Sequence, residues 1–269
     1  MPTLRRITTA PTFAILTLSI FASPFSSRLF AQEDQSSNFS ATEIVRRADQ
    51  KTRGLSSRSE TIISIVRPTY TRDMTMISWS LGDEFFLILI TEPTRDRGTT
   101  FLKRGTEIWN WLPTIERTVK LPPSMMSQNW MGTDFTNDDL VKQASVIVDY
   151  THEILGEEDV EGLPCWRIEL IPKEEAAVVW GRILLWIDKE HDMMLRGEYY
   201  DEENYLINVM AGRAPKEFDG IMLPSVLEMI PAEEEGQKTV MTTVNLEFNI
   251  DETESFFTTR NMRNVKASD

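Results

Sequence analysis

The chain has 269 residues, of which 41% are hydrophobic, and it carries a formal net charge of −14. A chain of this size and composition can bury a full hydrophobic core, which excludes intrinsic disorder and removes any need for disulfide staples. The acidity argues against nucleic-acid binding and against docking to anionic lipid surfaces through a basic face.

The N-terminal residues have the pattern of an export signal. Two arginines precede a short apolar run at residues 12–21, and a stretch of small and polar residues follows it. The run is shorter than the ~20 residues of a membrane-spanning helix. We therefore predict a signal peptide at residues 1–31 and a periplasmic mature chain of net charge −17. An uncleaved N-terminal anchor is the alternative.

The first element expected after the signal is a short amphipathic helix. Ser40 and Glu43 have the spacing of a capping box, and an apolar stripe follows them. Gly54 is a typical stop for such a helix. A second helix is expected to begin at Asn137, where a cap residue precedes two acidic residues.

Between and after these helices the apolar residues alternate with a period of two, which predicts strands. Residues 84–91 (EFFLILIT) and 180–187 (WGRILLWI) are apolar on both faces, so both faces should be covered. Clusters of Gly, Asp, Glu and Pro separate the segments. We expect about ten or eleven strands in meander order, forming one large curved antiparallel sheet with a few helices, mainly β in class (α+β), in a single domain at residues 32–269.

Little in the sequence points to catalysis. The histidines, His152 and His191, are far apart and lack the clustered spacing of zinc ligands. The sequence contains no Gly-x-Ser-x-Gly motif, which forms the nucleophile elbow of hydrolases, and no phosphate-binding glycine loop. The acidic runs at 157–159, 201–203 and 233–235 are interpreted as solvated hairpin tips. We predict no enzyme activity, no catalytic residue, no metal site and no cofactor. A hydrolase on a barrel scaffold is the weakest alternative.

Cys165 is the only cysteine in the chain. It does not follow the export signal, so it is no lipid-attachment site, and it has no partner for a disulfide. Because it lies in an alternating strand pattern, we interpret it as a buried structural thiol and not as a nucleophile.

The apolar residues offer the better functional hypothesis. A curved sheet with apolar walls encloses either a packed core or a cavity for an apolar ligand, and periodicity does not separate the two. The methionine-rich segment after Pro122 and Pro123 suits either a flexible lid or a loop tucked under the sheet. The candidate lining or lid residues are Trp79, Trp109, Trp111, Met125, Met126, Trp130 and Met131.

From about Ser40 to Lys266, these segments resemble the LolA-like outer-membrane lipoprotein-sorting family, in its branch of longer, uncharacterised exported proteins. The most specific run is GTDFTNDDL at residues 132–140. The others are IWNWLP at 108–113 with Arg117, WID at 186–188 and GIMLP at 220–224.

The resemblance implies an unclosed half-barrel whose helices cover its concave face. It implies a monomeric periplasmic carrier that binds lipoprotein acyl chains or free lipid, moves them toward the outer membrane and meets an inner-membrane transporter. It supplies no catalytic residues. A carrier that meets anionic membranes would be expected to be less negative than this chain. For this reason a sterol-like molecule or an efflux substrate remains an alternative ligand. The alternative function is a non-enzymatic accessory module of a membrane transporter complex.

Overall fold

The computed structural model describes residues 39–141 and 145–268. The predicted signal peptide, residues 1–31, lies outside this part of the chain. Among the described residues, no helix has the length and apolar character needed to cross a membrane.

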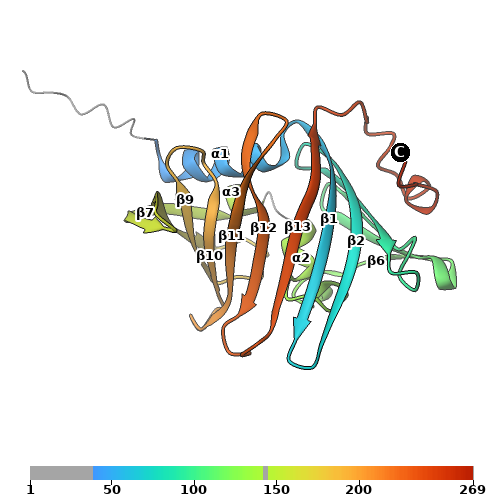
Figure 1. The fold of residues 1–269 in the computed structure, drawn as a ribbon, viewed down its shortest axis with the longest axis horizontal. Helices are drawn as coiled ribbons and strands as arrows, with labels where there is room; N and C mark the ends of the chain where they lie inside the picture. Colours follow the sequence, from blue (N-terminus) through green and yellow to red (C-terminus); the bar gives the residue numbers. More distant parts are fainter. Residues whose placement is uncertain (1–38, 142–144, 269) are drawn as a thin grey trace, which may run out of the picture. The chain divides into compact units, whose positions relative to one another are not determined.

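In the described part of the chain, thirteen antiparallel strands form one sheet. The sheet is open and curved (Figure 1). Their order is β6-β5-β4-β3-β2-β1-β13-β12-β11-β10-β9-β8-β7, so two meanders meet where β1 pairs with β13. The expected curved antiparallel sheet is confirmed. The strands are β1 Ser56–Arg67, β2 Tyr70–Leu81, β3 Phe85–Glu92, β4 Thr100–Arg104, β5 Glu107–Leu112, β6 Arg117–Lys120, β7 Tyr150–Val160, β8 Leu163–Pro172, β9 Arg182–Asp188, β10 Met194–Tyr200, β11 Leu206–Phe218, β12 Ile221–Pro231 and β13 Lys238–Phe248.

The topology forces one connection across the sheet. β6 and β7 follow each other in sequence but lie at opposite edges, so the residues between them traverse one face, which we call the concave face. This crossing connection contains the short helices α2 (Asn137–Val141) and α3 (Ser145–Val148). It shares the concave face with helix α1 (Ala41–Arg53).

Helix α1 has the boundaries that its sequence predicts. The Ser40 side chain accepts a hydrogen bond from the Glu43 backbone N–H at 3.2 Å, and Gly54 ends the helix with a φ of 62°. Ile44 and Val45 are buried against the concave face. Lysine and arginine occupy the last turn, where cations favour the helix dipole.

The convex face is also covered, in two places. Residues 251–268, which we call the C-terminal segment, pack on β2–β5 and bury Phe257 and Met262 against Trp79 and Leu87. A second cluster around Cys165 and Trp186 lies on the other wing. Both apolar faces of β3 are therefore buried, as its sequence predicts. The acidic run at residues 251–254 predicts no more than a short last helix or turn, and the segment contains the single turn η4 (Asn261–Arg263).

Some sequence expectations were wrong. The strand count was too low, since β6 has only four residues and too few for a visible alternation. The acidic run 157–159 is no hairpin tip but lies inside β7, whose turn comes after Val160. As an edge strand, β7 is protected by these charges from pairing with other chains. The sequence pattern also predicts a strand over residues 145–155, but residues 145–148 are helical and the strand begins at Tyr150.

Strict alternation over residues 180–187 predicts that Trp180 shares a sheet face with Leu184 and Trp186. Trp180 instead joins the concave core, while those two side chains lie in the convex cluster. The reason is that β9 begins only at Arg182, so the alternation does not extend back to Trp180.

Candidate functional site

A cavity of about 150 Å³ lies on the concave face beside the end of α1. Its floor comes from β1, β2 and β13, and its sides come from β3, β4 and the β2–β3 turn. It is lined by Thr52, Arg53, Ser57, Ser59, Thr61, Met76, Ser78, Ser80, Gly82, Asp83, Phe85, Phe86, Lys103, Met241, Thr243 and Leu246. It is smaller than the 300–1,000 Å³ typical of ligand pockets.

The floor of the cavity is a block of hydroxyl side chains. Strand register places Ser57 opposite Ser80 and Ser59 opposite Ser78, and the two Oγ atoms of each pair are 2.7 Å apart. Thr61 lies next along β1 on the same face. Because serine side chains are short, this block leaves space above the sheet.

The same strands become apolar at a sharp boundary. Beyond Thr61, the concave positions of β1 are Ile63 and Ile65, and beyond Ser78 those of β2 are Met76 and Met74. These side chains belong to the main core and are almost fully buried. The cavity therefore has a polar floor that adjoins an apolar wall.

Charged groups form the rim. Lys103 is largely buried and donates from Nζ to the Asp83 carbonyl oxygen at 2.5 Å. Arg53 is ion-paired with Asp49, its i,i+4 neighbour on α1. Burial lowers the pKa of Arg53, and the nearby Asp83 opposes this effect. Both cations of the rim therefore already have polar partners, a carboxylate for Arg53 and a backbone carbonyl for Lys103.

The crossing connection shares the concave face with α1 and is anchored by two arginines. Arg67 donates to both carboxylate oxygens of Asp134, at 2.9 and 3.0 Å, and Thr239 donates to the same carboxylate at 2.7 Å. Arg72 donates to the Met131 carbonyl at 2.6 Å. This anchoring favours a tucked loop as the resting arrangement of the methionine-rich segment.

A second polar cluster lies deeper in the connection. The Trp180 indole N–H donates to Asp139 at 2.9 Å, and the Tyr150 hydroxyl donates to the Trp180 carbonyl at 3.1 Å. Burial raises the pKa of Asp139. The Asp139 side chain also caps α2 by accepting from the Thr136 backbone N–H at 2.8 Å. The contacts of these groups hold the connection in place.

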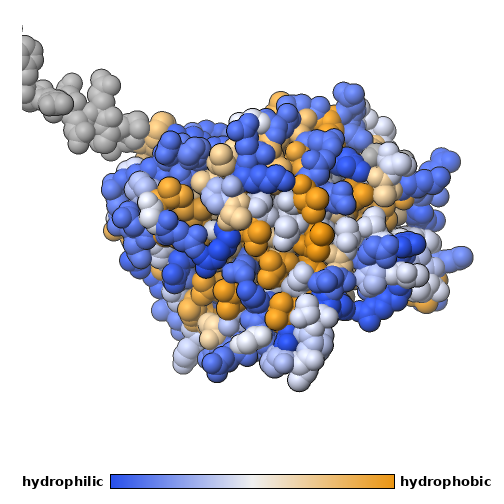
Figure 2. Space-filling model, in the orientation of Figure 1, coloured by the Kyte–Doolittle hydropathy of each residue, from blue (hydrophilic) through white to orange (hydrophobic). Residues whose placement is uncertain are grey.

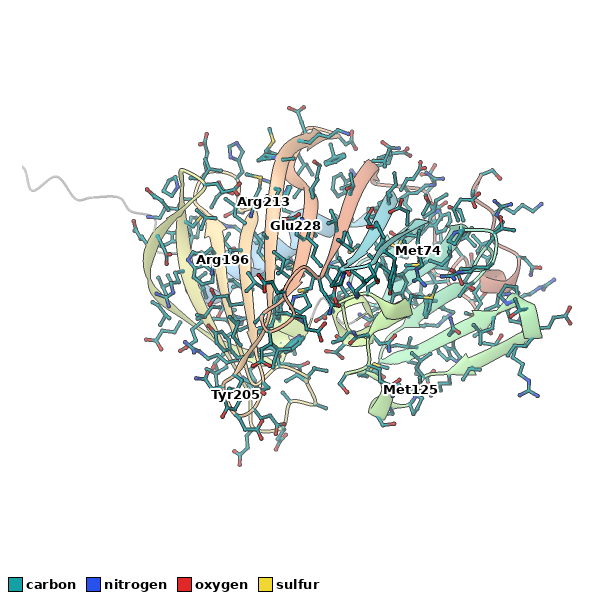
Figure 3. The ribbon with its side chains drawn as sticks, turned by 60° about the horizontal axis from the view of Figure 1, so that its bottom comes forward. Met74, Met125, Arg196, Tyr205, Arg213 and Glu228 are labelled. Carbon is teal, nitrogen blue, oxygen red and sulfur yellow. The ribbon has the colours of Figure 1, made fainter. Side chains whose placement is uncertain are left out.

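The residues expected to line a site fall on two faces. Met126, Trp130 and Met131 pack in the concave core, where Trp130 lies 5.3 Å from the Phe101 ring. Met125 is half-buried on the crossing connection, far from Arg196 and Arg213 on the other wing (Figure 3).

Trp79, Trp109 and Trp111 lie on the convex face under the C-terminal segment. Trp109 and Trp111 share this face because strand side chains two apart point the same way. The structure does not bring these three tryptophans into contact with the cavity.

The hydroxyl floor was missed from the sequence, although a signal exists. Serine and threonine recur at every second position in SSRSET (56–61), and Ser78 and Ser80 repeat this spacing on the next strand. Only the β1–β2 register joins the two runs into one block.

No arrangement typical of metal chemistry occurs within residues 39–141 and 145–268, since no group of three or more His, Cys, Asp or Glu side chains is placed to hold a metal ion. Both ring nitrogens of His152 are hydrogen-bonded, to Thr42 at 3.1 Å and to the Val146 carbonyl at 2.7 Å. Burial lowers the pKa of this histidine, so it is neutral near pH 7. It links α1 and the crossing connection to β7.

Cys165 is fully buried, and burial raises the pKa of its thiol to about 11. We expect iodoacetamide at about pH 8 to leave the folded protein unmodified, because only about one thiol in 10³ is ionised and the sulfur is shielded. In concentrated urea the same thiol should react readily, since its ordinary pKa is about 8.5. Mass spectrometry measures both. Rapid labelling of the folded chain would contradict a structural role.

A larger hollow of about 520 Å³ lies along the C-terminal segment. It is a shallow depression that is open to solvent, lined mainly by polar residues such as Thr253, Ser255 and Asn261. An apolar ligand would gain little burial there, so the concave cavity is the better candidate site.

Comparisons with known proteins agree with this architecture. The model of a family described as uncharacterized proteins matches residues 82–264. A DUF1329 family protein from Desulfovibrio piger has 23% identity and a TM-score of 0.75, with 82% of this chain and 97% of that one covered. A putative outer-membrane lipoprotein-sorting protein domain from Vibrio parahaemolyticus has 22% identity and a TM-score of 0.75, with coverage of 83% and 98%.

A LolA superfamily protein from Nitrosomonas europaea is similar to the same extent, with 22% identity, a TM-score of 0.71 and coverage of 82% and 99%. The comparison with curated proteins finds no match. At these identities the solved structures establish a shared fold, which is the unclosed half-barrel of the LolA type.

Proposed function

Because this chain belongs to the family of uncharacterized proteins that matches at residues 82–264, and has the LolA-like fold, we propose that it is a non-enzymatic periplasmic carrier of an apolar ligand. The ligand is a lipid or the acyl chains of a lipoprotein, carried toward the outer membrane. The observation that carries the proposal is the concave cavity, where an apolar wall adjoins a hydroxyl floor inside an open half-barrel.

The size of the cavity bears on how a ligand would bind. A volume of about 150 Å³ accommodates a benzene-sized group and not a whole acyl chain. Binding therefore requires the concave packing to open, and the crossing connection is the element that would move. The methionine-rich residues Met125, Met126 and Met131 are proposed to re-pack around the chain, since methionine adapts to varied apolar partners. Trp130 would move with them.

The export signal that the sequence predicts at residues 1–31 supports the periplasmic location, and an inner-membrane transporter would then be the source of the ligand. Two tests address these points. N-terminal sequencing of periplasmic protein should find a start near Gln32. Native mass spectrometry of protein from its own host should find bound lipid, and protein that is always empty would favour the accessory-module alternative.

The carrier proposal predicts saturable binding of a fluorescent fatty-acid probe with a stoichiometry near one. Met241→Glu places a charge in the cavity wall and should lower the affinity for the probe by more than about tenfold, because burying an unpaired carboxylate is costly. Ile62→Glu is the control, since Ile62 lies on the adjacent strand and is 39% exposed. Fluorescence titration measures both variants. Equal losses in the two would contradict a concave site.

One observation favours the accessory module as a second candidate. Acidic residues are concentrated in residues 149–250, which contain 23 Asp and Glu against 8 Lys and Arg. The face seen in Figure 2 has apolar patches among hydrophilic residues. The exposed apolar residues of strands β11 and β13 include Ile207 and Val244, and Arg213 of β11 is ion-paired with Glu228 of β12. A basic membrane-complex subunit would suit such a surface.

A further inference from the structure

We propose that the hydroxyl floor of the cavity is a subsite for neutral oxygen acceptors of the ligand, such as the carbonyl oxygens of ester-linked acyl chains. This inference rests on the proposed carrier function and specifies which part of a lipid is recognised. It assigns the two serine pairs, Ser57 with Ser80 and Ser59 with Ser78, to ligand binding.

The first argument is the count of protons. A hydroxyl group carries one proton and accepts through two lone pairs. In each serine pair one proton lies between the two oxygens, so the second proton remains available for another acceptor. Across the described chain, the hydrogen bonds of these four side chains are the two cross-strand bonds of 2.7 Å. Each pair therefore presents one further donor beside the cavity.

The second argument is position. The four serines and Thr61 contrast with the apolar core positions further along the same strands, which are Ile63 and Ile65 on β1 and Met74 and Met76 on β2. Ser57, Ser78 and Ser80 are buried, and buried hydroxyls destabilise a protein unless they are hydrogen-bonded. All four serines line the cavity, which continues past them to Thr61 and Met76. Apolar side chains at these positions would have filled the space.

The third argument concerns the charge of the acceptor. Arg53 is ion-paired with Asp49 and lies near Asp83, and the Lys103 ammonium donates to the Asp83 backbone carbonyl. The formal charges of these four side chains sum to zero, so the rim offers no net attraction for an anion. What remains to recognise a ligand is the pair of hydroxyl protons. Neutral carbonyl oxygens are the acceptors that match them, and the adjoining wall of Met76, Phe86 and Met241 suits the chain that follows.

The test compares two lipids that differ only at this oxygen. A monoacylglycerol has an ester carbonyl, and an alkylglycerol of equal chain length has an ether without one. In competition with the fluorescent fatty acid, the wild type should bind the ester about tenfold more tightly, which is the effect of one or two net hydrogen bonds. The quadruple variant S57A/S59A/S78A/S80A should bind both lipids equally.

Removing both members of each pair leaves no unpaired partner, so this variant is expected to fold. Ser64→Ala is the matched control, because Ser64 is on the opposite face of β1 and donates to Asp73. Infrared spectra of the bound, carbonyl-labelled ester give a second readout. The hydrogen-bonded carbonyl band should appear in the wild type and in Ser64→Ala and vanish in the quadruple variant.

The outcomes separate the two proposals. If the fatty acid and both glycerol lipids fail to bind, the carrier proposal falls and the subsite falls with it. If both lipids bind and the quadruple variant keeps the same ester preference, the subsite is overturned while the carrier stands. A synthetic diacylglyceryl-cysteine peptide, tested beside a diacylglycerol, identifies the source of the ester. Tighter hydroxyl-dependent binding of the peptide indicates a lipoprotein, and tighter binding of the diacylglycerol indicates a free lipid.

Discussion

Asp134→Ala is expected to lower the free energy of unfolding by about 3–5 kcal/mol, because it leaves the charge of Arg67 buried without its partner. The Arg67 side chain is 13% exposed and that of Asp134 is 5% exposed, so water screens the pair little. The same carboxylate accepts from Thr239, which ties the crossing connection to β13 as well as β1. Urea denaturation followed by tryptophan fluorescence measures the loss.

Two further variants make the result specific. Glu107→Ala removes an ion pair with Lys120 whose side chains are about half exposed, and it should change stability by no more than about 0.5 kcal/mol. The double variant R67M/D134L replaces both charges by apolar groups and should recover part of the loss. A single Asp134→Ala change as mild as the Glu107 control would show that the connection is held by its apolar contacts alone.

The second large effect is expected at the C-terminal segment. Phe257 is completely buried, with its ring centroid 5.7 Å from that of Phe85 and 5.3 Å from that of Phe256. Phe257→Ala should therefore cost about 3–5 kcal/mol of stability. Tyr70→Ala, at a side chain that is 57% exposed, is the aromatic control and should have little effect.

The same variant separates the two faces of the sheet. Since Phe257 covers the convex face and the cavity is concave, Phe257→Ala should leave the affinity for the fatty-acid probe within about twofold. The measurement is made well below the melting temperature of the variant. A large loss of probe binding in the folded variant would assign Trp79, Trp109 and Trp111 to the ligand site after all.

Much of the fold could be predicted because its signals are local. The cap at Ser40, the stop at Gly54 and the apolar faces of residues 85–92 depend on neighbours in sequence, and the structure has them as expected. The union of β1 with β13 and the path of the crossing connection depend on residues far apart. Neither the turn residues nor the hydrophobic periodicity of the sequence indicates which distant strands pair.

The candidate site was harder to predict than the fold, because it too depends on residues that are far apart in the sequence. Tryptophan and methionine are conspicuous, but alternation does not tell which face of a strand is concave, so Trp79 and Trp130 were grouped although opposite faces contain them. The serines do not by themselves indicate a site, because single serines are common on protein surfaces. Their meaning depends on the register that places Ser57 beside Ser80.

The pairing of β1 with β13 also affects how the chain folds during and after its synthesis. The two strands are separated by about 170 residues of sequence, and closing so long a loop is slow compared with forming the hairpins within each wing. Until β13 has been synthesised, β1 has one bare edge that is available to other chains. If the chain is exported as proposed, its N-terminal part crosses the membrane first and arrives before β13 is available to pair with β1. We then expect β1 to be the segment that chaperones on the far side of the membrane must shield.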